Sequence, residues 1–288
     1  MTQIGRHAAD HDESRRGAQC SEPGVEGAIA AATVLASSGP RVLVLGGSTE
    51  GFAAAEALVA RGYDVITSFA GRTKRRRDPL GASRVGGFGG VDGFAAYLAV
   101  EDIALVVDAT HPFASRMKSN ASAACAELGT PLIHIDRPQW TRQPGDDWRI
   151  VPDPAAAAEL APASEGVCFV TLGRQHVHHF EKRHDLDLLF RVIDPPEQPC
   201  RHPRADFIFD RGPFNLEAER ALFEERRVTC LVTKNSGSSA AEAKLAVARE
   251  RGVPVIIVDR PTPVDGQVFS SVEEAVAAAA EMLGRPSA

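Results

Sequence analysis

From residue 41 onward, short apolar segments alternate with segments that have the periodicity of amphipathic helices. Residues 42–45, 65–69 and 103–107 are apolar runs of strand length, and helical patterns lie between them. This alternation is typical of parallel strands joined by helices that cover both faces of a sheet. It predicts an α/β fold. No apolar run reaches the roughly 20 residues that a membrane helix needs.

The chain has 288 residues, which is enough for two domains. Residues 137–147 hold two prolines and a tryptophan without periodicity, so we expect a domain boundary there. The prediction is a first domain over residues 40–140 and a second α/β domain over residues 141–288, with mainly parallel sheets and a cleft between them. Residues 1–39 differ in composition and are expected to form a disordered extension rather than a secretory leader.

Composition limits the possible ligands. The net charge of −6 argues against broad nucleic-acid binding, which needs a basic face, so local basic clusters must meet any anionic ligand. The five cysteines form no Cys-x-x-Cys pair and are expected to be reduced thiols in a cytoplasmic protein. A histidine-rich stretch lacks an acidic or cysteine partner at zinc-site spacing, so no metal site is predicted; its members are His176, His178, His179 and His184.

The turn after the first predicted strand suits a phosphate. Its backbone N–H groups and the dipole of the following helix can bind an anion, and its residues are Gly46, Gly47, Ser48, Thr49, Glu50 and Gly51. The turn lacks both the Gly-x-Gly-x-x-Gly spacing of the dinucleotide fingerprint and the lysine of a P-loop. The alternative is a tight turn in which Ser48 or Thr49 caps the helix.

The end of the second predicted strand distinguishes between cofactors. A site for NAD would place an acid there for the ribose hydroxyls, whereas this chain has Ser68, Gly71, Arg72 and Thr73. A hydroxyl and a guanidinium favour a 2′-phosphate, so the sequence predicts NADPH. A solvated basic loop is the alternative. Gly87 lies in a second glycine-rich loop, residues 86–90, which we expect to lie against a ligand unless it is a flexible connector.

A polar cluster follows the strand at residues 103–107. Asp108, Thr110 and His111 lie where α/β proteins place their chemistry, and Pro112 is expected at the first position of a helix that buries Phe113, Met117, Ala121, Ala124 and Leu128. In the alternative interpretation His111 only caps this helix while Asp108 fixes the turn.

Cations follow three predicted strands of the second half. Lys234, Asn235 and Ser236 join a strand to a helix that carries Lys244, and Arg174 and Arg211 lie at two other strand ends. In an acidic protein, several cations at successive strand ends predict an anion-binding cleft.

Four segments, in their order along the chain, together resemble the precorrin-6A reductase family of cobalamin biosynthesis: residues 86–90, 108–114, 211–213 and 233–237. The resemblance covers about residues 41–283. It implies two Rossmann-like domains and the NADPH-dependent reduction of one double bond in a tetrapyrrole, the corrin-precursor macrocycle. It also implies that residues 46–51 and 68–73 hold NADPH, with Thr110 and His111 near the nicotinamide. Phe52 departs from the family, in which an arginine is often found, and Ser238 stands where a glycine is common.

The macrocycle carries many carboxylates, so the strand-end cations are expected to bind it. We expect His111 to donate the proton because an imidazole pKa can lie near neutrality; a water held by Asp108 is the alternative. Two other functions are an NADP-binding regulatory module without turnover and a different NADPH-dependent reductase. A short-chain dehydrogenase is disfavoured because neither Tyr63 nor Tyr97 has a lysine four residues on. A transient contact with neighbouring pathway enzymes is also expected.

Overall fold

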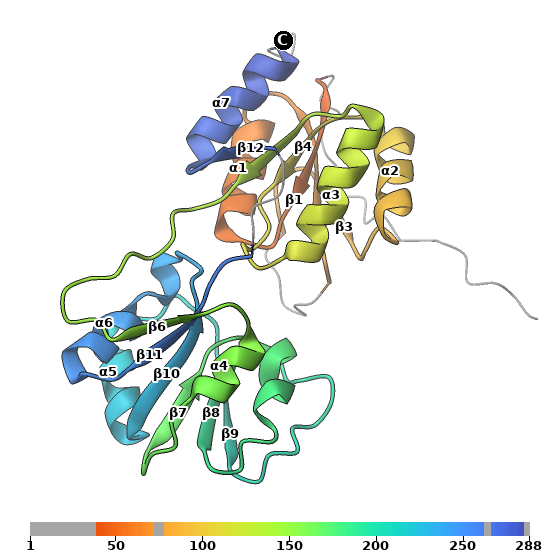
Figure 1. Ribbon diagram of the computed structural model, residues 1–288. Helices are drawn as coiled ribbons and strands as arrows, with labels where there is room; N and C mark the ends of the chain where they lie inside the picture. Colours follow the sequence, from red (N-terminus) through yellow and green to blue (C-terminus); the bar gives the residue numbers. More distant parts are fainter. Residues whose placement is uncertain (1–38, 72–77, 262–265, 285–288) are drawn as a thin grey trace, which may run out of the picture.

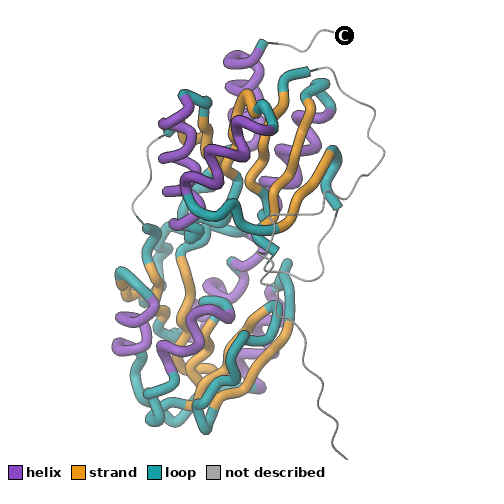
Figure 2. The backbone as a smooth tube through the Cα atoms, turned by 90° about the vertical axis from the view of Figure 1, so that its right-hand side faces the viewer, coloured by secondary structure: helices purple, strands orange, loops and turns teal. Residues whose placement is uncertain are grey.

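The computed structural model describes residues 39–71, 78–261 and 266–284, which form two lobes, each built on a six-stranded parallel sheet (Figure 1). The strand orders are β12-β5-β4-β1-β2-β3 and β6-β11-β10-β7-β8-β9. Helices lie on both faces of each sheet (Figure 2). The α/β prediction is confirmed. Residues 1–38, and with them nearly all of the expected extension, lie outside the described residues, as do Arg72 and Thr73.

The first lobe takes its strands and helices from both ends of the described chain. Its elements are β1 (Arg41–Leu45), α1 (Thr49–Val59), β2 (Asp64–Phe69), β3 (Ala82–Val85), α2 (Val91–Val100), β4 (Ile103–Asp108), α3 (Ser115–Leu128), β5 (Leu132–Ile135), β12 (Gln267–Phe269) and α7 (Val272–Leu283). The strands are apolar because helices cover both faces of the sheet, and four of the five β1 residues are buried.

The second lobe contains the middle of the chain. Its elements are β6 (Trp148–Val151), α4 (Pro154–Leu160), β7 (Val167–Val170), the 3₁₀ helix η1 (Arg174–Phe180), β8 (Asp187–Val192), β9 (Ala205–Phe209), α5 (Leu216–Glu225), β10 (Val228–Lys234), the 3₁₀ turn η2 (Ser239–Ala241), α6 (Ala243–Arg251) and β11 (Val255–Val258). The three strands predicted to precede Arg174, Arg211 and Lys234 are present as β7, β9 and β10. β6 and α4 were not predicted.

Neighbouring strands bring the predicted site segments to the same sheet edge. β1 lies between β2 and β4, with Leu45 opposite both Ser68 and Asp108. The segments after these three strands therefore emerge side by side at the carboxyl edge of the first sheet, where α/β proteins bind ligands. In the second lobe β10 lies between β7 and β11, and its last residue, Lys234, is opposite Val258.

The structure divides the chain differently from the predicted boundary at residue 140. β12 pairs with β5, and α7 packs in the core of the first lobe through Ala275, Val276 and Ala279. The chain therefore crosses between the lobes twice, and residues 267–283 do not belong to the second domain in which they were expected. A stripe of apolar residues shows that one face of a helix is buried, but it does not identify the sheet against which the helix packs.

The helix expected from Pro112 begins three residues later. α3 starts at Ser115, with a turn before it in which the Phe113 N–H donates to His111 Nδ1 over 3.2 Å. Phe113 does not join the buried face of this helix and instead packs against the core of the second lobe. Leu128, expected in the core, is 43% exposed at the last turn of α3.

Candidate active site

The turn between β1 and α1 has the geometry of an anion site. Ser48 caps α1 by accepting from the Gly51 N–H over 3.0 Å, and its hydroxyl donates to the Ala109 carbonyl over 2.7 Å. Gly51 packs against Gly46, because a Cβ at Gly51 would lie 2.9 Å from Gly46 Cα. Gly47 has a φ of +110° and open space where a Cβ would point. Ser48 thus fixes the turn, while Gly47 leaves room beside the helix N-terminus for a phosphate.

Asp108 is the centre of a buried polar cluster. Its Oδ1 accepts from the Thr110 N–H (2.9 Å) and hydroxyl (2.6 Å), and its Oδ2 contacts Lys118 Nζ (3.1 Å) and His134 Nδ1 (2.9 Å). Burial alone would raise the Asp108 pKa, but these hydrogen bonds and the Lys118 charge lower it to about 2. The carboxylate is fully buried and surrounded by protein donors. Its geometry suits holding the Thr110 turn in place rather than holding a water molecule.

His111 is neutral at physiological pH. Its pKa is lowered to about 3, mainly by burial and also by the charges of Lys234, Arg137, Arg260 and Lys118. Because Nδ1 accepts from the Phe113 N–H, the hydrogen bonding places the ring hydrogen on Nε2. The structure therefore does not support the expected pKa near neutrality, and His111 is suited to donating a hydrogen bond rather than to losing a proton from an imidazolium.

Sequence reasoning missed a cation at the end of β2. Arg84 in β3 donates to Ser68 Oγ over 2.7 Å and to the carbonyls of Gly86 (3.2 Å) and Gly87 (3.0 Å). Its guanidinium carbon lies 3.9 Å from the centroid of the Phe88 ring. No carboxylate among the described residues forms an ion pair with Arg84. A single arginine in the edge strand β3 gives no sequence signal, because only the pairing of β3 with β2 brings it to Ser68.

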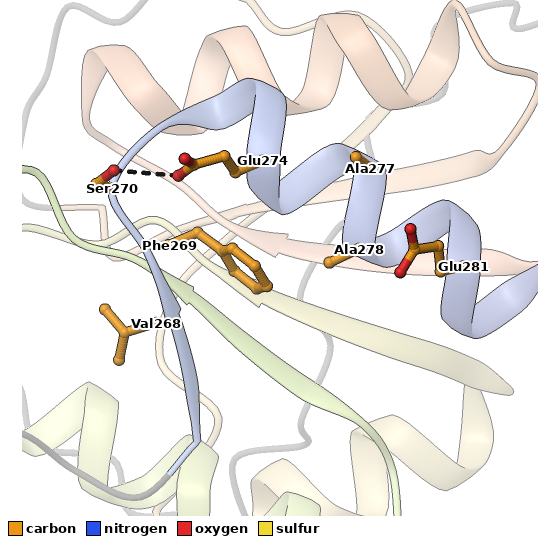
Figure 3. Close-up of a pocket in the computed structure, with 7 residues that line it drawn as sticks. All are labelled: Val268, Phe269, Ser270, Glu274, Ala277, Ala278 and Glu281. Carbon is orange, nitrogen blue, oxygen red and sulfur yellow. Dashed lines mark hydrogen bonds between the residues drawn. The ribbon is translucent and has the colours of Figure 1, made fainter.

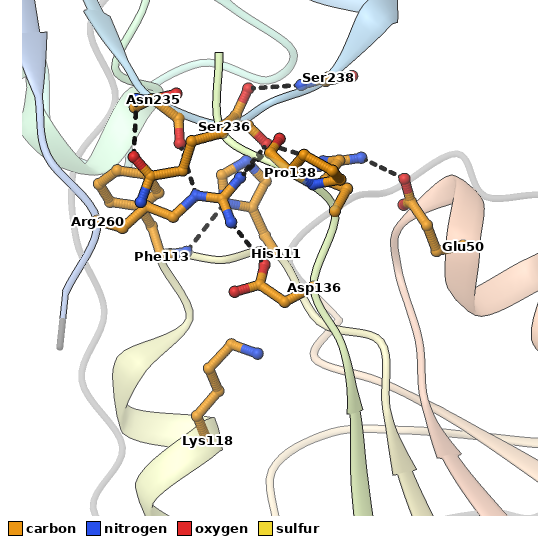
Figure 4. A network of polar contacts seen from close by, with 12 residues as sticks. Glu50, His111, Phe113, Lys118, Asp136, Pro138, Asn235, Ser236, Ser238 and Arg260 are labelled. Atoms are coloured by element: carbon orange, nitrogen blue, oxygen red, sulfur yellow. Dashed lines mark hydrogen bonds and ion pairs between the residues drawn. The ribbon is translucent and has the colours of Figure 1, made fainter. Parts of the chain in front are cut away.

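Two arginines at the chain crossings connect the lobes (Figure 4). Arg137 pairs with Glu50 at the start of α1 (Nη1 to Oε1, 2.6 Å) and donates to the Ser236 carbonyl in the turn after β10 (2.8 Å). Arg260 donates to the carbonyls of Asn235 (2.9 Å) and Ser236 (3.2 Å) and pairs with Asp136 over 2.9 Å. The predicted phosphate turn of one lobe and the predicted anion turn of the other are therefore tied together.

A pocket of about 250 Å³ lies beside the turn that follows β10. His111 from the first lobe lines it together with Lys234 and Lys244 from the second. The Lys234 ammonium is 5.3 Å from the centroid of the Phe113 ring, so a first-lobe aromatic ring covers this lysine. The structure thus brings His111, Lys234 and Lys244 to one cavity at the junction of the lobes.

Ser236 also lines this pocket, whereas the remaining residues predicted to bind the substrate have protein partners or lie elsewhere. Asn235 holds the interlobe segment, since its Oδ1 accepts from the Trp140 N–H over 2.9 Å. Arg174 donates to the Pro195 carbonyl over 3.1 Å and pairs with Glu197 over 3.4 Å. Arg211 is exposed and does not line the pocket, although its neighbour Gly212 does.

A second hollow, of about 580 Å³, lies between β12 and α7 (Figure 3). Its charged lining groups are Glu274 and Glu281, so it does not suit an anion. In the described part of the chain, no group of three or more His, Cys, Asp or Glu side chains is placed to hold a metal. No helix of that part is long and apolar enough to cross a bilayer.

The geometry agrees with the comparisons with known proteins. The family model of the precorrin-6x reductase CbiJ/CobK matches residues 41–280. The chain belongs to this family. It is 42% identical over 234 residues to the precorrin-6A reductase of Rhodobacter capsulatus, covering 81% of this chain and 93% of the relative. The cobalt-precorrin-6A reductase of Priestia megaterium is 30% identical over 249 residues, covering 82% of this chain and 96% of the relative.

Comparison with a solved structure shows that the similarity extends over the whole fold. The CobK precorrin-6A reductase structure superposes with a TM-score of 0.81 at 40% sequence identity, covering 86% of this chain and 98% of that one. The family resemblance and the prediction of an oxidoreductase with two Rossmann-like domains are confirmed. Membership of this reductase family agrees with a nicotinamide cofactor at the carboxyl edge of the first sheet.

Proposed function

We propose that this member of the precorrin-6x reductase family reduces one double bond of precorrin-6A with NADPH, as part of cobalamin biosynthesis. The observation that carries the proposal is the junction of the lobes. There, a glycine-containing turn at a helix N-terminus is hydrogen-bonded to Ala109, directly before Thr110 and His111, and His111 lines a pocket together with two lysines of the second lobe. Cofactor and macrocycle can meet at this junction, each bound by its own lobe.

The residues at the edge of the first sheet fit NADPH. The α1 N-terminus and the open side of Gly47 suit the pyrophosphate. Ser68 accepts a hydrogen bond from Arg84, so its own hydroxyl hydrogen is available to another acceptor. No carboxylate of the described residues forms an ion pair with Arg84, so this pair presents donors and a positive charge. Donors suit a 2′-phosphate, whereas the diol of NADH calls for an acid.

The second lobe fits a polyanionic macrocycle. Lys234 and Lys244 reach the pocket, and Arg211 is an exposed cation next to Gly212 at its border. Relatives named for the cobalt-free substrate reach 43% identity, against 30% for the cobalt-precorrin-6A reductase of Priestia megaterium. This difference favours the cobalt-free macrocycle as the substrate.

The chain itself supplies position and charge. Bound NADPH would supply the hydride, and the Asp108 cluster holds Thr110 and the following turn in place. The Nε2–H of neutral His111 is suited to a hydrogen bond with the reacting edge of the macrocycle. The proton at the partner carbon then comes from another donor or from water held at the junction. A cytoplasmic location and transient contact with other pathway enzymes remain predictions.

The experiment is to mix purified protein with precorrin-6A and either NADPH or NADH while following the macrocycle absorption spectrum. The proposal expects reduction with a preference for NADPH. A regulatory NADP-binding module would bind the cofactor and leave the spectrum unchanged. Oxidation of NADPH by other carbonyl or enone compounds, without reduction of precorrin-6A, would indicate a different reductase.

A further inference from the structure

Lys244, in the first turn of α6, is a buried lysine that lines the pocket. It is 5% exposed, and no acceptor of the described residues lies within hydrogen-bond or ion-pair distance of its Nζ atom. Its Nζ atom lies 5.5 Å from the centroid of the Trp140 ring. Lys244 Nζ is not among the described polar side-chain atoms that lack both a hydrogen-bond partner and contact with solvent. Because it has no such partner, its amine must be open to the pocket that it lines.

The charged groups around Lys244 come from β8, α5, β10 and the segment after β9. Arg191 on β8 is engaged by Glu219 on α5, with contacts that include Nη2 to Oε2 at 3.1 Å, so these two charges cancel. Lys234 on β10 faces the same pocket. Asp210 also lines it and keeps its negative charge, which solvent screens because the residue is exposed; its carboxylate accepts from the Arg211 N–H over 2.7 Å. His111, the remaining titratable lining group, is neutral near pH 7.

This setting changes the protonation of Lys244. Its pKa is lowered to about 7, mainly by burial and also by the charges of Arg191 and Lys234, against an opposing effect of Glu219. Near pH 7 the side chain is therefore divided between amine and ammonium. A carboxylate that entered the pocket would favour the ammonium, because an opposite charge at contact distance raises a lysine pKa.

The size of the pocket limits what can enter. Complete small-molecule sites have volumes of roughly 300–1,000 Å³, so a cavity of about 250 Å³ suits a side arm better than a whole macrocycle. We propose that the pocket receives one carboxylate arm of the substrate, and that Lys244 takes up a proton from solvent to become the counter-ion of that arm. The inference rests on the proposed function for the identity of the macrocycle. No bond other than this N–H forms, and the carboxylate stays ionised.

The test is calorimetric titration of the full chain with precorrin-6A, without NADPH, in two buffers of different ionisation enthalpy at pH 6 and pH 8. If the bound arm restores the ordinary lysine pKa, uptake is about 0.9 proton at pH 8 and about 0.1 at pH 6. Substrate carboxylates are ionised at pH 8 and contribute no uptake there.

Two variants and a control identify the group that takes up the proton. Lys244→Met should abolish the uptake at pH 8 and weaken binding about tenfold or more at pH 6. Lys244→Arg keeps a charge that does not titrate, so it should bind without uptake. Lys182→Met changes an exposed lysine and should behave like the unmodified protein. The pH dependence of the unmodified protein tests the proposal even if a variant fails to fold.

Binding without proton uptake at pH 8, or uptake that persists in Lys244→Met, would overturn the inference. If precorrin-6A is reduced by NADPH but its binding is not proton-linked, the inference fails while the proposed function stands. If precorrin-6A does not bind, both fail. Proton-linked binding without reduction would overturn the proposed function and leave the carboxylate pocket supported.

Discussion

Replacing Asp108 with asparagine should destabilise the first lobe strongly. The carboxylate is fully buried and accepts from Thr110, Lys118 and His134. In the variant, an amide NH₂ or a neutral oxygen faces the Lys118 ammonium, and a buried charge is left without its partner. Removal of one member of a buried ion pair costs about 3–5 kcal/mol. For a lobe of this size that corresponds to a fall in melting temperature of roughly 6–20 °C.

The stabilisation of the fold by Asp108 also depends on pH. The folded-state pKa of Asp108 is about 2, below its ordinary value of 3.8, so the ionised carboxylate favours the folded state. This difference contributes about 2 kcal/mol that is fully present above pH 4 and is lost as pH falls through 2. The stability gap between the unmodified protein and Asp108→Asn should therefore narrow over this window.

Differential scanning calorimetry at pH 7, with urea unfolding at pH 4 and below, measures both effects. Asp187→Asn is the matched control, because Asp187 pairs with Arg204 over 3.1 Å while both side chains are more than 40% exposed. A pair of this kind contributes less than about 1 kcal/mol. Equal small losses for the two variants would refute the reasoning that the Asp108 cluster organises this edge of the sheet.

Three further predictions concern the ligands. Arg84→Met removes the charge beside Ser68 and should weaken NADPH binding about tenfold or more while NADH binding changes little, as measured by fluorescence titration; equal losses would make Arg84 structural only. Lys234→Ala should raise the Michaelis constant for the macrocycle by roughly 10- to 150-fold and leave NADPH affinity unchanged; the reverse pattern would exchange the ligands of the two lobes. Because the His111 pKa is about 3, His111→Asn should leave any inflection of kcat/KM between pH 5 and 8 in place, and loss of an inflection would make His111 the titrating group.

Local patterns in the sequence were enough to predict the parallel sheets. β1 and β10 are apolar runs because both faces of each sheet are covered, and each is followed by a turn with polar groups. The same patterns located Thr110, His111 and Lys234 at strand ends, and the fold then brings His111 and Lys234 to one pocket. Parallel sheets generally bind ligands at the carboxyl ends of their strands, so a single sequence was enough to predict on which edge of the sheet the site lies.

Contacts between distant segments could not be predicted in this way. The partners of Asp108 include His134, 26 residues away, and Arg84 reaches Ser68 only through the pairing of β3 with β2. The return of α7 to the first lobe depends on which apolar surface remains uncovered, and Phe113 leaves its helix for the other lobe. Each of these outcomes is decided by tertiary packing, for which periodicity along the chain carries no signal.

The central claim is that hydride passes from a nicotinamide bound at the first lobe to a macrocycle bound at the second. The direct measurement is incubation of the protein with precorrin-6A and NADPH carrying deuterium on the transferable face of the nicotinamide C4, followed by mass spectrometry of the macrocycle. The account predicts a reduced product that carries one deuterium from the cofactor. A reduced macrocycle without deuterium, or an unchanged macrocycle in the presence of bound NADPH, would contradict it.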